Sequence, residues 1–264
     1  MRYFLCLAGM AFALAACSSD SPSAPTSSED DLRLSEADVG DDGDDDFDNN
    51  DDDAPRRPRT YEVTIENRTT GQPFSPGVIA THSKRASFWR TGAPASEGLR
   101  LIAEDGNESV ALAELRATPG VFEAISTMAP IGRQGGPPVF PTSRTFTIRA
   151  GGNANRLSIA VMLICTNDGF TGTSSVRLPG GFKARTHLVG AWDSGTEQNN
   201  EKWDQIVDPC GAIGPVPAAP DGNGRVATSD VVRVHGNIQG VGDLSRDAHG
   251  WRFPVAKITV RRID

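Results

Sequence analysis

The chain has 264 residues and a formal net charge of −8, but the charge is unevenly distributed. Residues 18–58 contain 15 acidic residues and 3 Arg, whereas residues 59–264 contain 22 basic and 19 acidic residues. The nearly neutral remainder has no broad basic surface of the kind that binds nucleic acid. The 28 Gly and 18 Pro argue against a helical bundle and favour strands joined by turns.

The N-terminus is typical of an export signal. Arg2 supplies a positive charge, and residues 3–16 are continuously apolar but too short to span a bilayer comfortably. Residues 14–17 (LAAC) resemble the lipobox of bacterial lipoproteins, in which the cysteine becomes the acylated N-terminus. We therefore expect residues 1–16 to be a lipoprotein signal peptide and Cys17 to be lipidated, with a plain secretory signal as the alternative.

The same motif predicts where the protein resides. Ser18 after the cysteine resembles the pattern that is sorted to the outer membrane. We expect an outer-membrane lipoprotein of the bacterial cell envelope, facing the periplasm or the cell surface. Its contact with the membrane would be through the lipid anchor alone, since the buried acyl carbons hold it there.

Residues 17–58 are expected to form a disordered acidic linker behind the lipid. The segment is rich in Ser and Pro, and residues 41–53 are almost purely acidic, so self-repulsion and missing apolar surface keep it extended. Clustered carboxylates could also hold Ca²⁺ weakly, but the spacing of an EF-hand loop is absent. We interpret the segment as a solvated tether.

Residues 59–264 are long enough for one well-buried core. Hydrophobic patterning predicts strands and short helices in this order: a strand at 61–66, a strand at 78–80, a helix at 96–106, a helical turn near 112–115, and strands at 146–148, 157–164, 189–192 and 255–263. Residues 157–164 (LSIAVMLI) are apolar on both faces, which is typical of a central strand covered on two sides. The pattern predicts an all-β fold, an antiparallel sandwich with short helical insertions.

Four cysteines are present in the chain. Cys6 would leave with the signal peptide and Cys17 would be lipidated, so Cys165 and Cys210 remain. Two thiols in an oxidising compartment permit a single pairing, and we expect a disulfide between them.

Two acidic loops follow predicted strands. Asp168 comes soon after the apolar strand, and Asp193 begins the segment 193–197 (DSGTE), in which a Gly turn and a hydroxyl precede a second acid. Two such loops at neighbouring strand ends would provide the several oxygen ligands that Ca²⁺ needs. Acids at strand ends also serve as plain turn formers, so this alternative stays open.

Four ordered sequence blocks within residues 60–263 resemble the spondin domain family, the N-terminal module of F-spondin and mindin. These blocks are 95–106 (ASEGLRLIAEDG), 168–172 (DGFTG), 193–196 (DSGT) and 254–259 (PVAKIT). The resemblance implies a C2-like antiparallel β-sandwich.

The resemblance also implies a divalent cation, Ca²⁺, bound by acids at the positions of Asp168 and Asp193. A third family ligand, a Glu on the strand before the long apolar one, has no counterpart, because residues 146–149 (FTIR) contain no carboxylate. Glu197 is the possible substitute, and Thr196 completes the predicted metal site.

We therefore expect a non-enzymatic, membrane-anchored, adhesion-type module that binds another protein or a surface glycan through a calcium-stabilised rim. One alternative is a hydrolase that uses the segment 235–251, where His235, Asp243 and His249 occur without any known catalytic spacing. The other alternative is a purely structural envelope lipoprotein.

Overall fold

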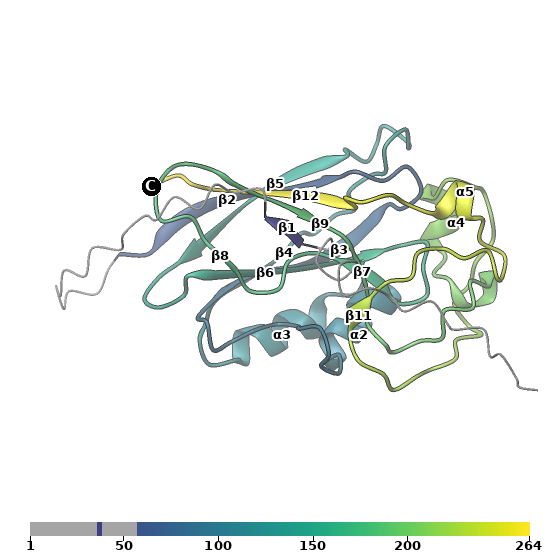
Figure 1. The fold of residues 1–264 in the computed structure, drawn as a ribbon, viewed down its shortest axis with the longest axis horizontal. Helices are drawn as coiled ribbons and strands as arrows, with labels where there is room; N and C mark the ends of the chain where they lie inside the picture. Colours follow the sequence, from purple (N-terminus) through teal and green to yellow (C-terminus); the bar gives the residue numbers. More distant parts are fainter. Residues whose placement is uncertain (1–35, 39–56) are drawn as a thin grey trace, which may run out of the picture.

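The computed structural model describes residues 36–38 and 57–264, so the signal peptide, Cys17 and most of the acidic linker lie outside the described residues. The described chain forms two antiparallel sheets packed face to face, with short helices below and at one end (Figure 1). The predicted all-β sandwich with short helical insertions is confirmed. Among the described residues, none of the helices combines the length and apolar character that crossing a bilayer requires.

The first sheet has five strands. In spatial order they are β1 (Glu36–Asp38), β9 (Arg185–Val189), β12 (Ala256–Arg262), β2 (Arg59–Asn67) and β5 (Ser143–Ala150). Alternate residues of β2 and β12 are buried, as their sequence alternation predicts. β1 falls within the segment that we expected to be a disordered linker, and it pairs antiparallel with β9.

The second sheet is built around the long apolar strand. In spatial order it contains β11 (Arg233–Val234), β10 (Ala191–Asp193), β7 (Gly169–Thr171), β6 (Arg156–Leu163), β3 (Phe74–His82) and β4 (Val121–Ser126), while β8 (Val176–Arg177) also pairs with β6. On β6, Ile159 and Val161 join the core between the sheets. Ala160 lies in the core on the opposite face, so the predicted central strand is covered on both sides.

Two helices cover the outer face of the second sheet, α2 (Glu97–Asp105) and α3 (Ser109–Ala117), as Figure 1 shows. The α2 helix begins where the Ser96 hydroxyl accepts a hydrogen bond from the Leu99 amide at 3.2 Å. It ends at Gly106, whose φ of 64° is the left-handed conformation that glycine adopts easily. Leu99 and Ile102, on the inner face of α2, are buried against the sheet.

The remaining helices lie at the right-hand end of the sandwich in Figure 1: η1 (Trp203–Gln205), α4 (Pro209–Ile213) and α5 (Arg246–His249). At this end β2 and β6 finish, and β3 and β12 begin. We call this end the rim. It is formed by the loops 67–73, 164–168, 194–201 and 235–255.

The strand predicted at 189–192 is wrong as a single element. β9 ends at Val189 in the first sheet, and β10 begins at Ala191 in the second sheet. Val189 and Ala191 both contribute to the core between the sheets. The chain therefore turns a corner at Gly190, which a continuous run of apolar residues does not reveal.

A disulfide joins Cys165 to Cys210, the pairing that the sequence predicts, with Cα atoms 5.1 Å apart. Both residues are fully buried, in a small apolar cluster with Met162 and Ile206. The bridge therefore attaches α4 to the loop that follows the central strand.

Removing the disulfide should destabilise the fold. The bridge closes a loop with a sequence separation of 45, so we expect the Cys165→Ala/Cys210→Ala double variant to lose about 2–4 kcal/mol of unfolding free energy. Urea denaturation followed by tryptophan fluorescence measures this loss. The unmodified chain under reducing conditions should match the variant, and equal denaturation midpoints in the oxidised and reduced chain would contradict the expectation.

Candidate functional site

The pairing of β7 with β10 brings the two acidic loops together at the rim. Asp193, the last residue of β10, lies opposite Gly169, the first residue of β7. Asp168 directly precedes Gly169, and its carbonyl oxygen accepts a hydrogen bond from the Ser194 amide at 3.2 Å. The two loops expected to share one edge of the sandwich therefore do so.

Asp168 is fully buried, and one of its carboxylate oxygens organises the second loop. Its Oδ2 atom accepts three hydrogen bonds, from the Thr196 amide at 2.8 Å, the Glu197 amide at 3.1 Å and the Ser194 hydroxyl at 3.0 Å. The Oδ1 atom is buried and has no hydrogen-bond partner. Burial, together with the charge of Asp193, raises the pKa of Asp168 to about 6.

Glu197 is the second buried acid of this cluster, with 1% of its surface exposed. Its Oε1 atom accepts a hydrogen bond from the Asn167 side-chain amide at 3.1 Å. The Oε2 atom has no hydrogen-bond partner, and its ion pair with Arg225 Nε is long, at 3.8 Å. Burial raises the pKa of Glu197 to about 8, and the charges of Glu104 and Asp168 add to this effect.

Asp193 differs from these two acids because both of its oxygens have partners. Oδ1 accepts a hydrogen bond from the Gly195 amide at 2.7 Å, in an Asx turn. Oδ2 accepts one from Asn199 Nδ2 at 2.7 Å and one from Arg233 Nη2 at 3.1 Å. The turn-forming role that the sequence left open is therefore present at Asp193.

Thr196, the fourth predicted site residue, contributes a hydroxyl that lies 2.6 Å from the Ser194 hydroxyl. Within the part of the chain that the structure describes, no three His, Cys, Asp or Glu side chains form a group able to hold a metal ion. The unpartnered oxygens are those of Asp168 and Glu197, and both are hard oxygen donors of the kind that Ca²⁺ takes.

Glu201 organises the rim, although nothing in its sequence surroundings distinguishes it. Its buried carboxylate accepts hydrogen bonds from three successive amides: Gln239 at 2.5 Å, Gly240 at 2.7 Å and Val241 at 2.9 Å. The sequence did not reveal this contact because about forty residues separate Glu201 from the three amides. Glu104 on α2 was also missed, and its negative charge contributes to the raised pKa of Glu197.

The segment considered for a hydrolase is held in the same network. His235 and His249 are buried, and burial lowers the pKa of both imidazoles. Asp243 accepts a hydrogen bond from the Trp203 amide at 2.9 Å. Within the described chain, no hydrogen bond joins Asp243 to either histidine, and the hydrolase alternative stays an untested prediction.

Replacing Glu201 by Gln should loosen the segment 239–241. The glutamine amide has one acceptor oxygen and no charge, so it cannot satisfy three N–H donors. We therefore expect the unfolding free energy to fall by about 1.5–3 kcal/mol. Hydrogen exchange should show faster exchange at residues 239–241 than in the unmodified chain. Glu62→Gln, at a partly exposed position on β2, is the control; equal exchange in both variants would contradict the role given to Glu201.

The Spondin_N family model matches residues 58–202, which is more than half of the chain and includes all four predicted metal-site residues. No curated protein matches the chain. The folded unit continues beyond the matched residues, because β12 lies between β2 and β9 in the first sheet. The match supports the interpretation of the folded body as an extracellular module, and the chain belongs to the Spondin_N family.

Proposed function

We propose that this chain is a non-catalytic, membrane-anchored binding module of the cell envelope whose rim is stabilised by Ca²⁺. The observation that carries the proposal is a pair of buried carboxylate oxygens without a hydrogen-bond partner, Asp168 Oδ1 and Glu197 Oε2, within one loop cluster. Burying an ionised carboxylate without a partner is costly. A divalent cation would offset that cost, because it supplies the missing charge and accepts several oxygen ligands.

The proposed ligands come from both predicted loops. Asp168 and Glu197 would provide the unpartnered carboxylate oxygens, and the Thr196 hydroxyl lies in the same loop. Asp193 would join them by exchanging its hydrogen bonds from Asn199 or Arg233 for the cation. Hard oxygen ligands favour Ca²⁺ over zinc.

The biological role follows from what such a cation would hold in place. Asp168 already connects the segment 194–197 to the start of β7, and a bound ion would fix these loops further. Rigid loops at one end of a sandwich are a common way to present a binding surface. With Cys17 lipidated and the residues before β1 as a tether, the rim would face a partner protein or a surface glycan.

Calcium should raise the thermal stability of the purified chain. We expect the melting temperature to rise by several degrees in excess Ca²⁺ and to fall back with EDTA, because the ion binds only the folded state. Asp168→Asn and Glu197→Gln should each abolish most of this rise. Asp208→Asn, at an exposed position that caps no helix through its side chain, should keep it. Equal shifts in all the variants would contradict the proposed site.

Without a divalent cation, stability should depend on the protonation of Glu197. Its pKa rises from an ordinary value of 4.5 to about 8 on folding, so the folded state binds the proton more tightly. The unfolding free energy should therefore decrease as the pH rises from about 4.5 to about 8.

Glu197→Gln removes this titration, so in EDTA at pH 8 we expect the variant to be more stable than the unmodified chain by about 1–3 kcal/mol. Urea denaturation across this pH range measures the difference. Added Ca²⁺ should reverse the order of the two proteins. A variant less stable than the unmodified chain in EDTA at pH 8 would show that the buried, ionised Glu197 does not destabilise the fold.

A further inference from the structure

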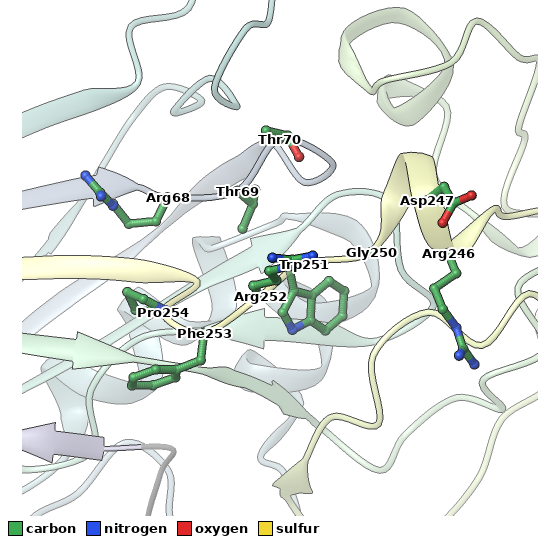
Figure 2. Close-up of a pocket in the computed structure, with 10 residues that line it drawn as sticks. All are labelled: Arg68, Thr69, Thr70, Arg246, Asp247, Gly250, Trp251, Arg252, Phe253 and Pro254. Carbon is green, nitrogen blue, oxygen red and sulfur yellow. The ribbon is translucent and has the colours of Figure 1, made fainter.

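A groove of about 630 Å³ opens on the rim, next to α5 (Figure 2). One wall is the loop 68–70, and the other consists of α5 and the segment 250–254. Figure 2 shows the Trp251 indole in the middle, between Arg246 on one side and Phe253 and Pro254 on the other. The volume is within the range of small-ligand sites, about 300–1,000 Å³.

Positive charge dominates the lining, although the whole chain is acidic. Three arginines, Arg68, Arg246 and Arg252, line the groove together with one acid, Asp247. Arg68 forms an ion pair with Glu66 at 2.5 Å. The Arg246 guanidinium donates a hydrogen bond to Gln239 Oε1 at 2.8 Å.

Arg252 is the least committed of the three arginines. It is exposed, and within the described residues no hydrogen bond or ion pair involves its guanidinium. A planar guanidinium with free N–H groups matches a carboxylate or a phosphate, with which it forms paired hydrogen bonds.

The aromatic part of the groove is held rigidly. The Asn237 side chain forms hydrogen bonds with both backbone polar groups of Trp251. Its Oδ1 accepts a hydrogen bond from the Trp251 amide at 3.2 Å, and its Nδ2 donates one to the Trp251 carbonyl at 2.9 Å. The His235 ring packs edge-on against the indole, with ring centroids 5.1 Å apart. Phe253 nearby is 43% exposed. A fixed aromatic surface binds a ligand without a large loss of side-chain entropy.

The two walls are also held at a fixed distance. Gln72 Nε2 donates hydrogen bonds to the His249 carbonyl at 2.6 Å and the Cys165 carbonyl at 3.0 Å. At Gly71 a Cβ atom would lie 2.6 Å from the Ala248 carbonyl oxygen, so only glycine allows this close approach. The groove is therefore formed before any ligand arrives.

We propose that this groove binds an anionic saccharide, a sugar that carries a carboxylate or a phosphate. The anionic group would pair with Arg252, and the apolar face of the sugar ring would pack against Trp251 and Phe253. The inference names a ligand class for the binding module proposed above. It rests on that proposed function in one respect, namely that the rim is where the module binds its ligand. Asp168 and Glu197 do not line the groove, so the calcium experiment can fail while this one succeeds, and the reverse.

The test is calorimetric titration of the purified full chain with four probes: a galacturonic acid trimer, glucose 1-phosphate, neutral maltotriose and inorganic phosphate. We expect at least one anionic sugar to bind about tenfold or more tightly than both maltotriose and inorganic phosphate, and the better of the two identifies the anionic group. Binding of inorganic phosphate as tight as that of the sugars, equal binding of maltotriose, or no binding of either anionic sugar would overturn the proposal.

Variants of Arg252 locate the binding. Arg252→Gln should lower the affinity for the anionic sugar about tenfold or more. The affinity of Arg252→Lys should lie between those of the unmodified chain and Arg252→Gln, because lysine keeps the charge and loses the planar guanidinium. Arg85→Gln is the matched control, since Arg85 is exposed and follows β3 at the opposite end of the sandwich. Unchanged melting temperatures show that the variants fold, and equal affinities of Arg252→Gln and Arg85→Gln would refute the assignment.

Discussion

The rim of this protein depends on the buried carboxylate of Asp168. Its Oδ2 atom receives three hydrogen bonds from the segment 194–197 and so joins the ends of β7 and β10. The interaction places a carboxylate where water cannot reach it, and Glu197 adds a second buried carboxyl group in the same loop cluster. Charged hydrogen bonds are strong but buried charges are costly, and this end of the sandwich has both: Asp168 Oδ2 is fully hydrogen-bonded, while Asp168 Oδ1 has no hydrogen-bond partner.

The same interaction begins a continuous polar network across the rim. Asn167 follows the central strand, donates to Glu197 and accepts a hydrogen bond from the Glu201 amide at 3.1 Å. The Glu201 carboxylate then binds the segment 239–241, and the nearby Asn237 fixes Trp251. The proposed calcium site and the arginine-lined groove are therefore parts of one framework, although they use different side chains.

The rest of the sandwich supports this framework by ordinary packing. The core between the sheets is formed by the inward faces of β2, β12, β6 and their neighbours, and a second core lies under α2 and α3. The disulfide attaches α4 to the loop that carries Asn167 and Asp168. The rim loops add to this packing, because Ile238 and Leu244 lie in the same buried cluster as Met162 of β6.

Much of this fold could be predicted from local patterns. The alternation in β2 and β12 and the doubly apolar run of β6 identified their elements correctly, because side-chain period and burial follow directly from strand geometry. The corner at Gly190 and the short strands β7 and β11 could not be predicted, and β10 was predicted only as the end of a longer strand at 189–192. Each is only two or three residues long, and such strands are defined by their partners rather than by their own residues.

The sequence by itself determined the fold class, the family resemblance, the pairing of the cysteines and the acids at the ends of two strands. Only the tertiary structure decided that Asp193 pairs with Arg233, that one oxygen of Glu197 has no hydrogen-bond partner, and that Glu201 holds a segment far along the chain. The physical reason is that hydrophobic patterns along the sequence reflect the side-chain repeat of a strand or a helix. Hydrogen bonding, charge pairing and burial at the rim depend on which loops the two sheets bring together.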